Sequence, residues 1–154
     1  MVICAICGSP YPKCLAQLLN QTSMKIESID PEFLYKDETH QIIGICMEVH
    51  RYLGHGFLEI VYKDAIEIEG RRKTIPVERE KEFDIEYKGI ILPHRFFADM
   101  VFFEKIIVEV KASEGALSNE NIAQTLNYLK ASGYKVGLLI NFGRSKLEFK
   151  RLVY

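Results

Sequence analysis

The sequence predicts an α/β fold in which a central mixed β-sheet is flanked by helices. Two segments with helical apolar spacing come first, three segments with strand character follow, and one more helical segment separates two last strands. Because the strands before and after that last helix are joined by one crossover connection, we expect them to be parallel neighbours with a right-handed connection. The order is that of an α/β or α+β sandwich.

The two N-terminal helices are expected over residues 39–53 and 58–71. In the first, apolar residues at i, i+3, i+4, i+7 and i+11 share one helical face, and Gly54 provides a natural end. The second follows the turn Gly54-His55-Gly56. Its buried side is expected to consist of Ile60, Val61, Ala65 and Ile68.

A three-stranded meander is expected next. Residues 77–87 alternate strictly, and their acidic face is interpreted as a solvated one, made of Glu78, Glu80, Glu82, Asp84 and Glu86. Lys88-Gly89 is expected to turn into a second strand that continues past Pro93 to residue 103. A turn at Glu104-Lys105 then leads into a third strand over 106–112.

The C-terminal part is expected to form a helix between two strands. A segment rich in small and polar residues (113–121) leads into a helix that ends at Gly133 and has Ile122, Leu126 and Leu129 on one side. The segment before it, 106–112, and the segment after it, 135–142, are both strongly apolar. A last alternating strand is expected over 147–154.

Length and composition favour one globular domain. The chain has 154 residues, of which 48% are hydrophobic and 27% charged. We expect a poorly structured extension over residues 1–28 and a single domain over 29–154. A net charge of −1 predicts no global electropositive field, and no apolar run approaches the roughly 18 residues of a membrane span. The expectation is a cytoplasmic protein without a membrane partner.

The cysteines cluster near the N-terminus without forming a complete metal motif. Cys4 and Cys7 have the spacing of half a zinc site, but Cys14 is the only further cysteine nearby, and Cys46 lies alone. We interpret Cys4, Cys7 and Cys14 as incidental reduced thiols of the extension.

Charged residues interrupt two strands that are otherwise apolar. Glu109 and Lys111 share one face of the segment IIVEVKA, and Asp99 interrupts the preceding strand. A hairpin in which paired residue numbers sum to about 209 would place Asp99 close to Val110. The two carboxylates and the Val110 carbonyl would then form an oxygen site suited to Mg²⁺ or Mn²⁺. Without such a site, Glu109 and Lys111 pair with each other or reach the rim of the sheet.

These residues resemble the motif of the PD-(D/E)xK phosphodiesterase superfamily, although Ala98 stands where a proline often precedes the Asp. Gln124 and Tyr128, at i and i+4 on the last helix, resemble the Q-x-x-x-Y element of its RecB-like and Cas4-like nuclease branch. Gly56, Glu59 and Tyr62 match the signature of the small group called GxxExxY proteins. The resemblance covers about residues 38–153 and implies a restriction-endonuclease-like core.

The resemblance also implies a mechanism. Asp99, Glu109, the Val110 carbonyl and Glu59 would hold Mg²⁺ or Mn²⁺, which would activate a water molecule. Lys111 would orient that water or offset negative charge, and Gln124 and Tyr128 would position the substrate or Lys111. The implied activity is a nuclease acting on nucleic acid, with DNA expected.

Several alternatives stay open at this point. The chain would otherwise be a non-catalytic protein of the same fold, acting as a dimer or as a subunit of a complex, or a small-molecule phosphohydrolase. The sequence leaves a homodimer open and does not decide between DNA and RNA. The cations that could contact phosphate are Arg71, Arg72, Lys73, Lys130, Lys135, Arg144, Lys146, Lys150 and Arg151.

Overall fold

A five-stranded mixed sheet lies at the centre of the structure, a computed structural model that describes residues 34–154. The strand order is β1-β4-β5-β6-β7, and β5 and β6 are parallel while the other neighbours are antiparallel. This confirms the predicted mixed sheet and its parallel pair. The strands are β1 (Val77–Phe83), β4 (Phe96–Phe102), β5 (Ile106–Lys111), β6 (Val136–Asn141) and β7 (Glu148–Val153).

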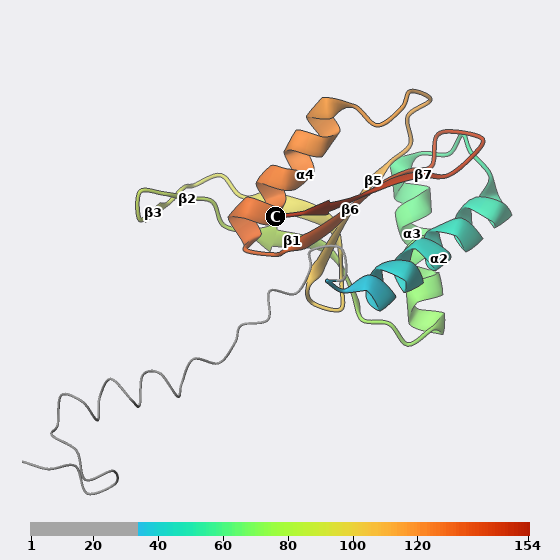
Figure 1. Cartoon of the computed structure of the whole chain (residues 1–154), viewed down its shortest axis with the longest axis horizontal. Coiled ribbons are helices and arrows are strands. Elements are labelled where there is room, and N and C mark those ends of the chain that lie inside the picture. The colour runs from blue at the N-terminus through green and yellow to red at the C-terminus, as the bar shows by residue number, and fades with distance from the viewer. Residues whose placement is uncertain (1–33) are drawn as a thin grey trace, which may run out of the picture. The chain divides into compact units, whose positions relative to one another are not determined.

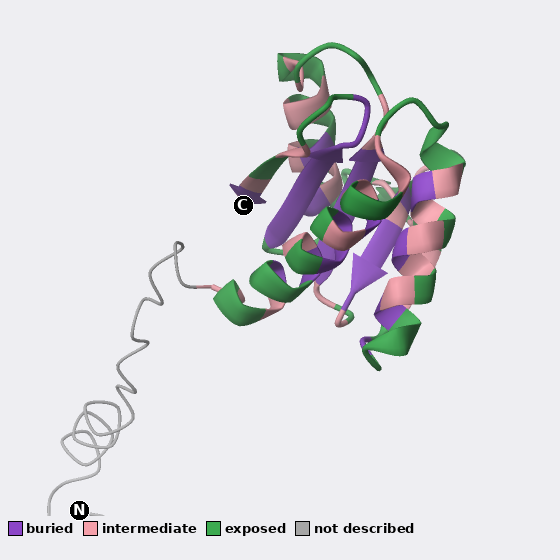
Figure 2. Cartoon of the chain, turned by 90° about the vertical axis from the view of Figure 1, so that its right-hand side faces the viewer, coloured by how far each residue is buried: buried purple, intermediate pink, exposed green. Residues whose placement is uncertain are grey.

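Helices cover both faces of this sheet (Figure 1). Helices α2 (Lys36–Leu53) and α3 (Glu59–Arg72) pack on one face, and α4 (Asn119–Ser132) packs on the other. Two apolar clusters result, and Figure 2 shows the buried strands between their helical layers. Ser118 caps the start of α4 in a capping box with Asn121, and Gly133, in the left-handed region, ends that helix as predicted.

Helix α3 buries a different side from the predicted one. The buried residues are Tyr62, Ile66 and Gly70, whereas Ile60 and Ile68 are 45% and 51% exposed. Val61 and Ala65 are only partly buried. Gly70 packs closely on this buried side, where an added Cβ would lie 2.6 Å from the Val77 side chain. Apolar spacing alone did not reveal that a residue without a side chain faces the sheet.

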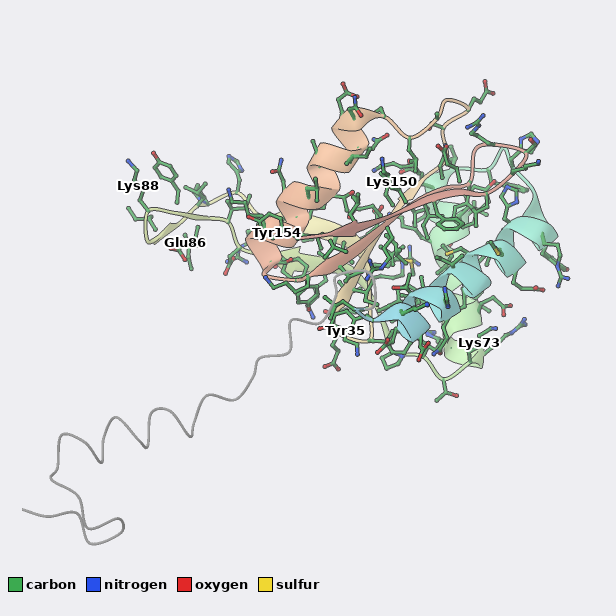
Figure 3. The ribbon with its side chains drawn as sticks, viewed as in Figure 1. Tyr35, Lys73, Glu86, Lys88, Lys150 and Tyr154 are labelled. Carbon is green, nitrogen blue, oxygen red and sulfur yellow. The ribbon has the colours of Figure 1, made fainter. Side chains whose placement is uncertain are left out.

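The segment expected to join two long strands forms a separate hairpin. Strands β2 (Glu86–Tyr87) and β3 (Ile90–Ile91) pair only with each other, and Lys88 and Gly89 form their turn with positive φ angles. This hairpin projects away from the main sheet, as the positions of Glu86 and Lys88 in Figure 3 show. Pro93 has no backbone N–H to donate to a sheet, so the pairing stops there and restarts at Phe96.

The turn between β4 and β5 includes the predicted Glu104-Lys105 and begins one residue earlier, at Phe103. Phe103 and Glu104 have positive φ, and the Lys105 N–H donates to the Phe102 carbonyl at 3.1 Å. The register therefore pairs Met100 with Val108 and Phe102 with Ile106, one residue away from the expected one. Asp99 nevertheless lies close to Val110, because the Val110 N–H donates to the Asp99 carboxylate.

Part of the sequence-based prediction concerns residues before Leu34. The predicted extension over 1–28, with Cys4, Cys7 and Cys14, lies outside the described residues. Cys46 is buried in α2. Within residues 34–154, no helix is long and apolar enough to cross a bilayer.

Gly143 follows β6 and has no room for a side chain. An added Cβ would lie 2.3 Å from the carbonyl oxygen of Ser113, just beyond β5. Gly143→Ala should therefore lower the free energy of unfolding by about 2 kcal/mol or more, because backbone atoms must move. The control Gly44→Ala, at an exposed helical position with open space, should raise it by roughly 0.5–1 kcal/mol. Urea unfolding measures both, and equal effects would contradict this packing.

Candidate active site

Asp99 and Glu109 lie where β4 and β5 separate. The backbone ladder between these strands ends at the Met100–Val108 pair. Beyond it, side chains replace backbone partners: the Val110 N–H donates to Asp99 Oδ2 at 2.9 Å, and the Asp99 N–H donates to Glu109 Oε1 at 3.3 Å. Two carboxylates therefore lie between two strands, and this explains why Asp99 is close to Val110 in spite of the different register.

The backbone of β4 at Asp99 and the backbone of β1 opposite it both depart from regular pleating. Ala98 packs in the cluster beneath α4, but Met100 packs in the cluster beneath α2 and α3, so the side-chain alternation shifts by one residue at Asp99. Opposite it on β1, Glu80 has φ of 49° and is omitted from the ladder. Such irregular positions in a sheet re-aim side chains. In this sheet the irregular positions, Glu80 on β1 and Asp99 on β4, lie opposite each other.

Glu109 is a buried carboxyl group with a perturbed pKa. It is 3% exposed. Burial and, second, the charge of Asp99 raise the pKa of Glu109 to about 8, while Lys111, the Asp99 N–H and Lys63 act in the opposite direction. The pair of carboxylates is therefore only partly neutralised by the protein.

Two lysines contact this pair from different elements. Lys63 Nζ on α3 lies 3.0 Å from Asp99 Oδ1 and 3.9 Å from Glu80 Oε1. Lys111 Nζ lies 3.9 Å from Glu109 Oε2. Lys111 is a predicted site residue, but Lys63 was missed. The available signal was its position four residues after Glu59, which places both on one helical face.

Glu59 lies apart from the carboxylate pair. It is exposed at the first turn of α3 and lines an open depression of about 430 Å³ together with Leu58, Lys63 and Ala112. Within residues 34–154, no three His, Cys, Asp or Glu side chains are grouped so that they could hold a metal ion. The metal-binding role expected for Glu59 therefore stays a prediction, as does that of the Val110 carbonyl.

The loop before Glu59 is fixed by Tyr62. Gly56 has φ of 105°, a conformation that favours glycine, as expected for a tight turn. The Tyr62 hydroxyl donates to the Gly54 carbonyl at 3.0 Å and accepts from the Phe57 N–H at 3.2 Å. Its ring stacks on Phe142 with centroids 4.5 Å apart. Tyr62 thus anchors the start of α3 to the core.

Helix α4 brings Gln124 and Tyr128 to the other side of the pair. Gln124 Nε2 donates to the Tyr128 hydroxyl at 2.9 Å, which leaves the hydroxyl proton free for another acceptor. Burial, followed by the charge of Glu109, raises the pKa of Tyr128, and Asp99 adds to this. Tyr128 therefore lies within the electrostatic reach of both carboxylates.

Asn141 is a second residue that sequence analysis missed. It is fully buried at the end of β6. Its Nδ2 donates to the carbonyls of Ser113 and Gly115 at 3.0 and 2.9 Å, and its Oδ1 accepts from the Ser113 N–H at 3.1 Å. These bonds hold the chain just beyond Lys111. No sequence signal separates this asparagine from an ordinary end-of-strand residue.

The donor set fits a hard divalent cation. Asp99 and Glu109 offer oxygen ligands and repel each other, and Mg²⁺ is commonly held by one or two carboxylates with water and substrate phosphate completing its coordination. A cation between the two groups would offset the burial and, second, the Asp99 repulsion that raise the pKa of Glu109.

Comparison with known proteins adds a family match. Residues 36–152 match a family model described as the PD-(D/E)XK nuclease superfamily. A solved structure titled "Crystal structure of SSO0001" is similar with 17% sequence identity and a TM-score of 0.48. The similarity covers 80% of this chain and 62% of that one, so this chain spans less than two thirds of its length. A search of curated proteins finds no significant match.

The raised pKa of Glu109 predicts how the stability of the metal-free protein depends on pH. Since the folded pKa of about 8 exceeds the ordinary value of 4.5, the folded state holds the proton more tightly than the unfolded chain. The stabilising contribution is fully present below pH 4.5 and is lost as the pH rises through about 8. Urea unfolding in a chelating buffer should therefore show stability falling over this range.

The isosteric variant Glu109→Gln provides the control, because it cannot ionise. It should show a smaller decrease over the same pH range and should be more stable than the wild type above pH 8. Parallel pH profiles for the two proteins would contradict the assignment.

Proposed function

Because the chain belongs to the PD-(D/E)XK nuclease superfamily, we propose that it hydrolyses phosphodiester bonds of nucleic acid with the help of a divalent cation, Mg²⁺ or Mn²⁺. The observation that carries the proposal is the insertion of Asp99 and Glu109 between two separated strands, beside Lys111. DNA is the proposed polymer. Within the superfamily we place the chain among the GxxExxY proteins and the RecB-like and Cas4-like branch.

Each residue has a proposed role that follows from its position. Asp99 and Glu109 would hold the cation, which would lower the pKa of a water molecule and stabilise charge at the phosphate. Lys111, partly exposed next to Glu109, donates to the attacking water or to a phosphate oxygen. Tyr128, whose hydroxyl accepts from Gln124, donates a hydrogen bond to a second phosphate oxygen.

Lys63 has a separate proposed role as a counter-cation. Its ammonium group lies 3.0 Å from Asp99 Oδ1 and is only 12% exposed, so it neutralises part of the carboxylate pair without any ion. A divalent cation must compete with this ammonium for Asp99. Lys63 would then turn toward Glu80, which is already 3.9 Å away, or toward substrate phosphate.

The first test is calorimetric titration of Mn²⁺ into the folded protein. The wild type should bind saturably and should release a proton below about pH 8, because Glu109 must ionise before it binds. The proton release is measured by repeating the titration in buffers with different ionisation enthalpies. Asp99→Asn should abolish binding. The matched control, Asp84→Asn on an exposed ion pair with Arg95, should bind as the wild type does.

A cleavage assay completes this test. With Mn²⁺ or Mg²⁺, the wild type should cut labelled oligonucleotides, and Lys111→Ala should lower the rate by about 100-fold or more while leaving Mn²⁺ binding intact. If folded wild type neither bound Mn²⁺ nor cut any nucleic acid, even with oligonucleotide present, a non-catalytic binding role would replace this proposal.

A further titration tests Lys63. Lys63→Met should raise the affinity for Mn²⁺ by about tenfold or more, because removal of a nearby positive charge relieves repulsion of the cation. The control is Lys105→Met, which removes a lysine from the remote ion pair with Glu38. Unchanged or weaker Mn²⁺ binding by folded Lys63→Met would show that the lysine does not compete with the cation.

A further inference from the structure

A groove beside the candidate active site is bounded by α4 and by the start of the β2–β3 hairpin. It has a volume of about 490 Å³, and the residues used below are Ile85, Glu86, Phe96, Asn127, Tyr128 and Lys130. Pockets of roughly 300–1,000 Å³ hold small molecules. Figure 3 shows Glu86 on the projecting hairpin that forms one side of the groove.

An aromatic stack lies beneath this groove, and the partly exposed Tyr128 is the end of the stack that lines it. Phe96 stacks on Tyr128 with ring centroids 4.4 Å apart and an interplanar angle of 10°. Phe83 continues the stack on Phe96 at 5.0 Å and 13°. Aromatic side chains, with an aliphatic neighbour such as Ile85, are the surfaces on which proteins stack unpaired nucleobases.

Polar groups at the groove are available to a ligand. Neither Asn127 nor Lys130 has a hydrogen-bond or ion-pair partner within residues 34–154. In contrast, Arg79, Lys81 and Arg95 around the neighbouring edge strand β1 are all ion-paired. Lys130 can therefore bind a phosphate, Asn127 can bind the edge of a base, and the Glu86 carboxylate can accept from a base amino group.

Tyr128 links the groove to the candidate active site. The ring of Tyr128 lines the groove, while its hydroxyl accepts from Gln124 and its pKa responds to the charges of Glu109 and Asp99. A nucleotide in the groove would therefore lie next to the phosphate that the carboxylates address.

We propose that this groove is a subsite for one unpaired nucleotide, with its base on the Tyr128 ring and its phosphate at Lys130. The proposal rests on the proposed nuclease function and names its substrate class. A base within a duplex is stacked and paired, so it must leave the helix to enter such a pocket. The substrate is therefore a single strand, or a strand with an unpaired nucleotide beside the bond that is cut.

The test compares the binding of single strands and blunt duplexes of the same sequence. The full chain carrying Lys111→Ala, which suppresses cleavage, is titrated into fluorescently labelled DNA at fixed salt, with fluorescence anisotropy as the readout. The single strand should bind about tenfold more tightly than the duplex. Adding Asn127→Ala and Lys130→Ala should weaken single-strand binding about tenfold and leave duplex binding within about twofold.

Lys73→Ala is the matched control for loss of a positive charge. Lys73, one of the cations that the sequence offered for phosphate contact, is exposed at the end of α3 and far from the hairpin in Figure 3, so a subsite in this groove predicts that its removal leaves both affinities unchanged. Asn127 and Lys130 are exposed on α4, so alanine at these positions should not impair folding.

The outcomes separate the subsite from the nuclease function. Equal binding of single strand and duplex, or no effect of the groove substitutions, would overturn the subsite, while cleavage by the wild type would still support the nuclease. Failure of the wild type to bind Mn²⁺ and to cut any nucleic acid would overturn the nuclease function, and the subsite with it.

Discussion

The burial of two neighbouring carboxyl groups between two strands of a sheet is the constraint on which the rest of this structure depends. Burying a charge without compensation costs several kcal/mol. Here the compensation comes from two backbone N–H groups, of Val110 and Asp99, and from Lys63 and Lys111. The strands must separate to supply those N–H groups. The interruption of the ladder is therefore the structural cost of holding Asp99 and Glu109 together.

The site also joins the two helical layers. Lys63 comes from α3, which packs with α2, whereas Tyr128 comes from α4, which covers the opposite face. Each helix is anchored near the site: Tyr62 ties the start of α3 to Gly54, and Asn141 holds the segment that leads from β5 toward α4. The geometry of the carboxylate pair and of its neighbours is thus set by long-range contacts from both layers.

The sequence predicts the fold and part of the candidate site, for identifiable reasons. Asp99, Glu109 and Lys111 are recognisable because charge is rare in strands that are otherwise apolar, and the order of elements follows from periodicity. The prediction of the buried face of α3 was wrong because Ile60 and Ile68 fit a helical apolar stripe as well as Tyr62 and Ile66 do. Lys63 and Asn141 could not be identified because their partners are distant in sequence. The separate hairpin was missed because the strict alternation of residues 77–87 hides the break between β1, which ends at Phe83, and β2.

The Lys63–Asp99 contact has a consequence for the proposed binding of a divalent cation. Many metal sites contribute the energy that folds their domain, so such chains are unfolded until loaded. In this chain an internal ammonium group balances part of the charge of Asp99, and the apolar clusters on both faces of the sheet include neither Asp99 nor Glu109. On the proposed function, folding and loading would therefore be separate events. The concentration of free cation would then set which fraction of the folded molecules is active.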